Sequence, residues 1–323
     1  MGDRPGPWPL EAAPLDRAPW MAMTGSTSGD TIPSTGLDPQ PPPLLAQPLE
    51  VAHVLVPLDG SPFAERVLPV AMWVAAGLGA DVHLVEVVPC EAQEEAEGAI
   101  RYLRSVARQH HAAAWDIVER NDVGAALADT AGSAPGRLAC LATHGEGRSV
   151  PLGSVAVSLL QRSNQPVVLV GPVARAVTAA DAPIVAAVDG TTRDDVLVSV
   201  ALGWAARLER RLDIVTVGEP APRWYLEGAR PRQARGPAGP ERYVESLAAR
   251  ADGAGVTIAP RVIYDPLSVQ DGLVPFLNRT AALVVVGSRH HQGLGRMVLG
   301  SHAVRIAHDA AVPAVVVPLP PGV

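Results

Sequence analysis

The chain has 323 residues, of which 48% are hydrophobic and only 4% aromatic, so it is long enough for two compact domains with a core of Ala, Val and Leu. Its formal net charge of −7 and isoelectric point near 5.7 argue against nucleic acid as a partner. All 26 basic residues are Arg and none is Lys, which excludes a Lys-dependent P-loop, a pyridoxal Schiff base and a catalytic Lys.

The first 50 residues differ from the rest of the chain. They hold 11 of the 32 prolines and show no sustained hydrophobic period, so we expect a disordered Pro-rich tail over 1–50. The N-terminus lacks the order of a signal peptide, and no apolar stretch of about 18 residues occurs. We therefore expect a cytoplasmic protein without a membrane span. Cys90 and Cys140 fall at or in expected strands, which predicts two reduced, buried thiols.

Strand and helix signals alternate in the first half of the chain. The expected strands are 53–58, 81–88, 115–120, 138–143 and 167–170, and the expected helices are 62–77, 91–111, 123–131 and 154–161. Ser61 is the expected N-cap of the first helix, with Pro62 at its first position.

The second half repeats this order. The expected strands are 184–188, 213–217, 256–264, 283–286 and 314–317, and the expected helices are 193–208, one ending near 251, 267–278 and 301–308. Thr192 and Asp195 stand at capping-box spacing, and a Pro/Gly/Arg-rich insertion occupies 219–240. Alternating strands and helices predict parallel sheets with right-handed crossovers.

The two halves repeat each other at both ends. Each opens with an apolar run that ends in Asp-Gly, at Asp59 and at Asp189, and these aspartates are about 130 residues apart. Each closes with a strand, a Gly-rich loop, a Gly-Ser pair that opens a helix, and a final β-branched strand. Such a loop presents unpaired N–H groups and the positive end of a helix dipole, which suits phosphate. We therefore expect two copies of one phosphate-binding module.

This pattern resembles the universal stress protein family, whose members are single or tandem open α/β domains related to the adenine-nucleotide α-hydrolases. The resemblance rests on Val-Pro-Leu-Asp-Gly-Ser-Pro at 56–62 and on a loop of Gly, two residues, Gly, nine residues, then Gly-Ser or Gly-Thr. It implies tandem open α/β domains at 51–175 and 181–319, each a five-stranded, mostly parallel sheet with helices on both faces.

The resemblance also has consequences for assembly. In this family, final strands join domains edge to edge, and a bare β-branched edge needs covering. Pairing of 167–170 with 314–317 is therefore expected to make a pseudo-dimer within the chain. A homodimer through the same last strands is a further expectation.

The second copy follows the family loop closely. Gly287 matches the first Gly, and Gly300 with Ser301 matches the closing pair at the family spacing. His290 stands at the second Gly. Either its imidazole blocks the approach of phosphates to the backbone, or His290 or Arg289 contacts the phosphate oxygens. The resemblance assigns Asp189 to the adenine or ribose end of a nucleotide, and the alternative is an ordinary turn or N-cap aspartate.

The first copy departs further from the family pattern. Ala142 replaces the first Gly and Gly145 fits the second, but only seven residues separate Gly145 from Gly153. Within this shortened loop Glu146 adds a carboxylate that repels phosphate. Asp59 matches the family aspartate, with the same turn or cap alternative as Asp189. The second domain is therefore the expected working site.

The resemblance implies a stress-response or regulatory module that binds ATP or a related adenine nucleotide, with Mg²⁺ only as a companion of ATP. Ser154 and Ser301 are expected as helix N-caps, with a phosphate contact as an addition. We expect no catalytic residue, no metal site and at most slow ATP hydrolysis, because no general base or zinc spacing stands out. One alternative is a degenerate tandem module that binds no nucleotide and acts through protein–protein interaction. Another, an enzyme of the α-hydrolase group, is disfavoured because the Ser-Gly-Gly-x-Asp-Ser signature is missing.

Overall fold

The fold is that of a computed structural model, which describes residues 41–144, 152–177, 179–218, 239–264, 268–290, 297–298 and 300–319. The strands are β1 His53–Pro57, β2 Asp81–Val88, β3 Ala114–Glu119, β4 Arg137–Ala142, β5 Val167–Val170, β6 Ile184–Ala187, β7 Leu212–Gly218, β8 Ile258–Tyr264, β9 Leu283–His290, β10 Met297–Val298 and β11 Ala314–Pro318. The helices are α1 Pro62–Glu65, α2 Leu68–Leu78, α3 Gln93–His110, α4 Val123–Gly132, α5 Ser154–Arg162, α6 Asp194–Arg207, α8 Pro240–Ala251, α9 Val269–Thr280 and α10 Ser301–Asp309. None of these helices is long and apolar enough to cross a membrane.

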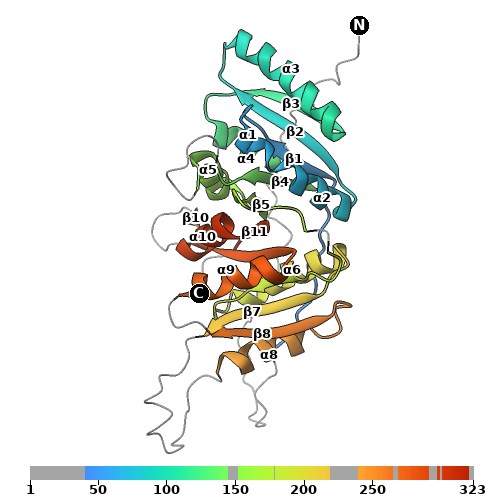
Figure 1. The fold of residues 1–323 in the computed structure, drawn as a ribbon, viewed down its shortest axis with the longest axis vertical. Helices are drawn as coiled ribbons and strands as arrows, with labels where there is room; N and C mark the ends of the chain where they lie inside the picture. The colour runs from blue at the N-terminus through green and yellow to red at the C-terminus, as the bar shows by residue number, and fades with distance from the viewer. Residues whose placement is uncertain are drawn as a thin grey trace, which may run out of the picture. The chain divides into compact units, whose positions relative to one another are not determined.

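Each domain contributes five parallel strands to the sheet, in the orders β3-β2-β1-β4-β5 and β8-β7-β6-β9-β11 (Figure 1). In each domain the first three strands are added on one side of the sheet and the later strands on the other. The strand order therefore reverses between β1 and β4, and between β6 and β9. Such a reversal point, at the carboxyl ends of the strands, is where open α/β sheets bind ligands. The expected fold class of two open α/β domains is confirmed.

The last strands of the two domains join the two sheets into one. β5 and β11 pair antiparallel, with Val168 opposite Val315, which confirms the expected pairing of 167–170 with 314–317. β5 also pairs with β4, and β11 also pairs with β9. Both edges of each last strand are thus occupied within one chain, so neither strand keeps an open edge for the expected homodimer.

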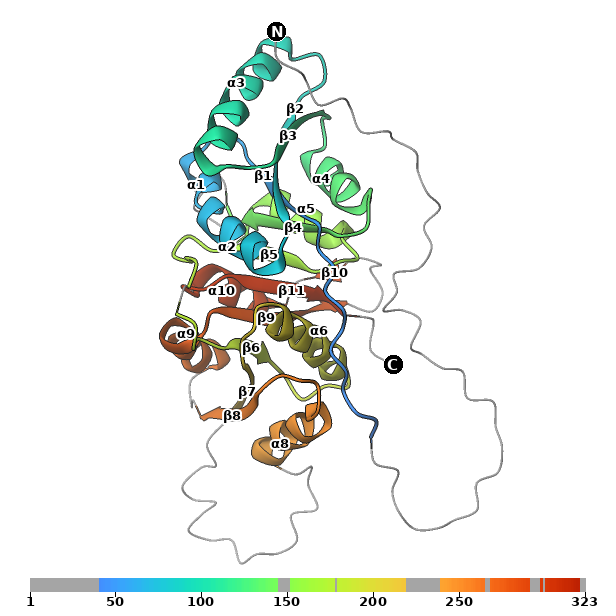
Figure 2. The ribbon, with the colours of Figure 1, turned by 90° about the vertical axis from the view of Figure 1, so that its right-hand side faces the viewer.

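The sheet separates two apolar layers (Figure 2). Successive residues of a strand face opposite sides, so Val54 packs with α2 and α3 while Leu55 packs with α4 and α5. The layer of Val54 continues under α6 and α8 of the second domain, and the layer of Leu55 continues under α9 and α10. Buried Ala, Val and Leu side chains dominate both layers, as the low aromatic content predicts.

The first expected helix, 62–77, is wrong as a single element. It is divided into α1 and α2, because Pro69 lies in the first turn of α2 and has no N–H for the carbonyl of Glu65. The expected cap is confirmed, since the Ser61 hydroxyl accepts a hydrogen bond from the N–H of Ala64 at 3.1 Å.

Three other expected caps are wrong. α6 begins at Asp194, and its N-cap residue Arg193 makes no capping hydrogen bond through its side chain, so the capping box of Thr192 and Asp195 does not form. The N-caps of α5 and α10 are glycines, Gly153 and Gly300, and each serine is the first helical residue instead. A glycine tolerates the extended N-cap backbone as well as a serine does.

The two thiols differ in exposure. Cys140 is buried in β4, where burial raises the pKa of its thiol, whereas Cys90 lies exposed just after β2. Neither forms a disulfide. The expectation of two buried thiols is therefore wrong for Cys90, which lies two residues beyond the end of β2.

The end of the segment expected as a tail is packed against the second domain. Residues 42–50, here called the strap, form neither helix nor strand. Leu44, 5% exposed, donates its N–H to the carbonyl of Arg250 at 2.7 Å, and Gln47 donates to the carbonyl of Ser199 at 2.9 Å. Figure 2 shows the strap in blue beside α6. Residues 1–40 and most of the Arg-rich insertion lie outside the described residues.

Candidate functional site

The candidate site lies at the carboxyl ends of β6 and β9, where the strand order of the second domain reverses. β6 leads into Asp189, and its neighbour β9 continues through Gly287 to His290. α10 follows β9 and returns the chain to β11, so it runs against the strands and begins at the same edge, at Gly300 and Ser301. The fold thereby brings the second-domain candidates to one edge of the sheet.

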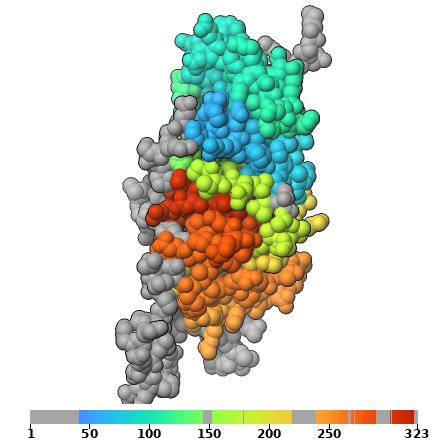
Figure 3. All heavy atoms as spheres, in the orientation of Figure 1, coloured from blue at the N-terminus to red at the C-terminus, as the bar shows by residue number. Residues whose placement is uncertain are grey.

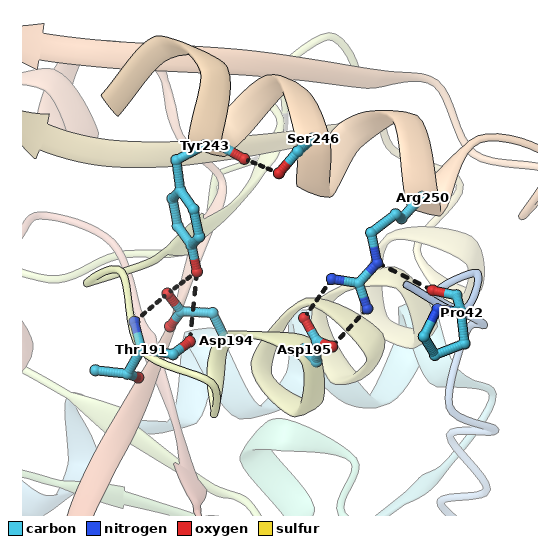
Figure 4. Close-up of polar contacts among 7 residues, drawn as sticks. All are labelled: Pro42, Thr191, Asp194, Asp195, Tyr243, Ser246 and Arg250. Carbon is cyan, nitrogen blue, oxygen red and sulfur yellow. Dashed lines mark hydrogen bonds and ion pairs between the residues drawn. The ribbon is translucent and has the colours of Figure 1, made fainter. Parts of the chain in front are cut away.

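The turn after β6 is held by a carboxylate that the sequence did not reveal. Asp194 Oδ2 accepts hydrogen bonds from the backbone N–H groups of Asp189, Gly190 and Thr191 at 3.2, 2.8 and 3.2 Å. Gly190 has a φ of +84°, which favours glycine and turns these N–H groups toward one acceptor. The hydroxyl of Tyr243 on α8 donates to the same oxygen at 2.7 Å (Figure 4).

Asp194 is an anion inside the fold. Its side chain lies under α8 and the residue is 2% exposed. Burial raises the pKa of Asp194 to about 6, helped by the charge of Asp189 and opposed by the hydrogen bonds from Tyr243, Gly190 and Asp189. Burial and the bond to Asp194 likewise raise the pKa of the Tyr243 phenol. The buried Asp194 carboxylate thus accepts the N–H groups of the turn, while Asp189 itself is exposed.

A second polar contact joins the same two helices to the strap. Arg250 on α8 makes a two-pronged ion pair with Asp195 on α6, at 2.8 and 2.5 Å. Its Nε donates to the carbonyl of Pro42 at 2.9 Å. Figure 4 shows both arms of Arg250 reaching from α8 to these partners. Because Asp194 and Asp195 are neighbours, the strap is fixed one residue away from the carboxylate that holds the turn.

The residues expected to bind phosphate lie on β9 and at the start of α10. A Cβ on Gly287 would lie 2.3 Å from Leu319 Cδ1, so this glycine makes room for the C-terminal segment. The backbone of His290 pairs with Met297 in the short β9–β10 ladder, and the side chains of His290 and Ser301 lie outside the described residues. Gly300 is extended, with φ −58° and ψ 147°. The first N–H groups of α10 have no partner within the helix and can bind an anion.

The corresponding edge of the first domain is held by different contacts. Asp59 Oδ1 accepts the N–H of Ser61 at 3.0 Å, so the family aspartate itself holds this turn. Burial, and then the charge of Asp59, raise the pKa of Glu86 to about 7. Gly153 donates its N–H to the carbonyl of Thr143 at 2.7 Å, which removes one donor from the start of α5, where Ser154 follows. Gly145 lies outside the described residues.

Both domains share a tyrosine–carboxylate contact that sequence reasoning missed. In the first domain the hydroxyl of Tyr102 on α3 donates to Glu65 of α1 at 2.9 Å, as Tyr243 does to Asp194 in the second. A tyrosine in the helix after the second strand of each half was the available signal. Among the described residues, no group of three or more His, Cys, Asp or Glu side chains is arranged to hold a metal ion.

Comparisons with known proteins give a consistent result. The family model described as "Universal stress protein family" matches residues 50–171 and 182–318. A universal stress protein from Archaeoglobus fulgidus DSM 4304 is similar in structure, with a TM-score of 0.60 and 17% identity over 82% of this chain and 98% of that one. A putative universal stress protein from Pseudomonas aeruginosa UCBPP-PA14 has a TM-score of 0.55 and 15% identity, over 84% of this chain and 94% of that one. At these identities the structural likeness concerns the fold.

Proposed function

This chain belongs to the universal stress protein family, and from that premise we propose that its second domain binds ATP or a related adenine nucleotide as a regulatory module. One observation carries the proposal. Asp189 follows β6, the neighbour of β9, and α10 begins after Gly300 on the same edge. An acceptor for the base or sugar therefore shares an edge with a helix end that favours phosphate.

The residues divide into two roles in this proposal. The exposed carboxylate of Asp189 accepts a hydrogen bond from the adenine or the ribose, and Asp194 keeps the turn of Asp189 in place. The backbone of Gly287, Gly300 and Ser301 faces the phosphates, with Mg²⁺ arriving only with ATP. His290 decides how closely the phosphates approach, and a His290→Gly substitution separates contact from obstruction: lower affinity indicates contact, higher affinity obstruction.

We propose binding without fast turnover. General-base catalysis needs a proton acceptor within reach of the attacking water, and the residues proposed here bind the nucleotide without supplying one. A cytoplasmic location is part of the proposal and fits the two thiols, which form no disulfide.

The decisive experiment compares the two domains within one protein. The purified chain is denatured to identify any nucleotide that co-purifies, and ATP is then titrated into fresh protein by calorimetry. We expect one ATP per chain, with binding lost in Asp189→Ala and in Ser301→Trp. The matched first-domain variants Asp59→Ala and Ser154→Trp should retain it. Unchanged affinity for ATP in both second-domain variants would contradict the assignment of the nucleotide site to the second domain.

A module that binds no nucleotide is the second candidate, and the glycines favour it. The space beside Gly287 is filled by Leu319, and the N–H of Gly153 is used by Thr143, so both glycines have packing roles that need no ligand. In this case the protein acts through its surfaces on other proteins. Absence of co-purified nucleotide, together with no heat at millimolar ATP, would favour this candidate over the first.

A further inference from the structure

A cavity lies at the edge of the second domain where the strands begin, opposite the candidate nucleotide site. Its volume is about 520 Å³. Its walls are the linker between β5 and β6, residue 211 just before β7, the end of α9 and the residues between α10 and β11. In Figure 3 the yellow-green linker lies at the surface beside the orange residues of α9. The cavity is therefore separate from the candidate nucleotide site, which lies where these strands end.

The side chains around this cavity are mainly cationic. Arg175, Arg211 and Arg279 line it, and the one carboxylate among its lining residues is Asp181, whose charge also acts on Arg210. Within the ranges that the structure describes, no carboxylate pairs with the guanidinium group of Arg175 or of Arg279. Both residues are exposed, so their charges are available to a ligand from solvent.

The third arginine, Arg211, is held in position by a buried carboxylate. Arg211 Nε donates to Asp213 Oδ1 at 3.0 Å, and Arg261 donates to the other oxygen of the same buried carboxylate at 2.6 Å. Two arginines share one carboxylate, so this group keeps a net positive charge. The bond uses only the Nε of Arg211 and leaves its two terminal nitrogens as donors.

The walls of the cavity are held in place without a ligand. Arg210 donates to the linker carbonyl of Ala182 at 2.8 Å, and Arg175 donates its backbone N–H to Ala311 at 3.1 Å. Asn278 accepts the N–H of Ala311 through its side-chain oxygen at 2.7 Å, so its amide NH₂ group remains a donor. A preformed site of this kind needs little reorganisation when a ligand binds.

We propose that this cavity binds a small phosphorylated metabolite, with the phosphate held by Arg175, Arg211 and Arg279. Planar guanidinium groups match phosphate oxygens in pairs. The volume lies within the usual range of small-molecule sites and exceeds what a single phosphate fills. Apolar lining from Val177, Pro183 and Val312 can receive the organic part. The site lies on the linker between the domains, and it goes beyond the nucleotide site proposed above.

The arginines have one competing explanation. α9 and α10 both end at this cavity, and a cation near a helix C-terminus neutralises its carbonyl groups. That role predicts a loss of stability when the arginines are removed, with no dependence on an added anion. The two explanations therefore differ in the response to phosphate.

The experiment uses the full chain carrying Ser301→Trp, so that the nucleotide site cannot contribute. Pyrophosphate, inorganic phosphate and malonate are titrated separately by calorimetry at constant ionic strength. The test variant is the double substitution Arg175→Gln and Arg279→Gln. The matched control, Arg101→Gln with Arg108→Gln, removes the same charge from exposed positions of α3.

We expect pyrophosphate to bind and its affinity to fall at least about tenfold in the test variant, while the control stays within about twofold. Circular dichroism confirms that both variants are folded, and the single substitution Arg279→Gln serves if the double variant is not. Binding of malonate as tight as that of pyrophosphate would overturn the phosphate assignment. No heat with any of the three anions, or equal loss in both variants, would overturn the site.

Discussion

The turn that contains Asp189 is held by the buried side chain of Asp194. Asp194 takes three backbone N–H groups and one phenol, and the same contacts that satisfy it oppose the effect of its burial on its pKa. In the first domain the turn is held by Asp59 itself. The two domains therefore hold this turn with different carboxylates.

A substitution of Asp194 tests this arrangement through pH. The pKa of Asp194 is about 6 in the folded chain against an ordinary value of 3.8. Between these values the folded state binds more protons than the unfolded state, so this group's contribution to the free energy of unfolding falls as pH rises. In Asp194→Asn this pH dependence is lost. The free energy of unfolding of the variant, relative to that of the native protein, should therefore rise between pH 4 and 7 by at most about 3 kcal/mol.

The measurement is urea denaturation at several pH values between 4 and 7. Glu95→Gln is the control, because Glu95 is an exposed carboxylate on α3. This control measures the effect of removing one negative charge from the surface. If Asp194→Asn runs parallel to the native protein over the same range, the raised pKa of Asp194 is contradicted.

At the scale of elements, periodicity predicted most of the strands. β5 has the expected ends 167 and 170, but β9 continues four residues past the expected end at 286. Gly287 and Ser288 pair with β11, and the last two residues pair with β10. This hairpin contact involves a segment whose Gly and His residues carry no strand signal. Local pattern is sufficient where burial on both faces determines the strand, and fails where a partner strand extends it.

The strap and the Asp194 contact show what the sequence could not predict. Leu44 is a buried apolar residue in a Pro-rich segment without a period, and its partner Arg250 is distant in sequence. Tyr243 lies 49 residues from Asp194. The candidate residues at strand ends and at helix starts were predictable because repeated local motifs mark them. Contacts between helices were not, because they depend on which elements the fold brings together.

Two glycines offer a matched test of the strap. A Cβ on Gly203 of α6 would lie 2.1 Å from the carbonyl oxygen of Gln47, whereas a Cβ on Gly98 of α3 would meet nothing within 4 Å. Gly98→Ala should raise the free energy of unfolding by roughly 0.5–1 kcal/mol through helix propensity. Gly203→Ala has the same intrinsic gain but must displace the strap, and we expect a net loss of about 1–3 kcal/mol.

Limited proteolysis makes this prediction specific to the strap. Cleavage within 42–50 should become faster in Gly203→Ala and stay unchanged in Gly98→Ala. Equal protection of the strap in the two variants, with equal gains in stability, would mean that Gly203 does not hold the strap in place.

At the scale of the whole Pro42–Val323 unit, the antiparallel pairing of β5 and β11 brings unlike ends of the two domains together. Domain 1 strands end on the side where domain 2 strands begin. A Cβ on Gly171, just after β5, would lie 2.5 Å from the carbonyl oxygen of Ala307 on α10. α10 therefore begins at the candidate site of its own domain and ends against Gly171 and His144 of the other domain.

A pair of histidines lies at this junction. His144, at the start of the domain 1 loop, contacts His308 near the end of α10, with ring centroids 5.1 Å apart. Burial, and then the charge of His308, lower the pKa of His144 below its ordinary 6.5. His308 Nδ1 lies 2.5 Å from Asp309, and His144 Nδ1 lies 3.0 Å from the Thr143 hydroxyl.

We expect stability to fall on acidification through this pair. A histidine whose pKa is lowered by folding binds fewer protons in the folded state, so its stabilising contribution is complete above pH 6.5 and is lost as pH falls. Histidine titration by NMR should place His144 below 6.5, and His308→Gln should move the pKa of His144 upward by removing the second charge. His110→Gln, on the distant helix α3, is the control and should leave it unchanged. If the pKa of His144 does not respond to His308→Gln, the two histidines are not electrostatically coupled across the β5–β11 pairing.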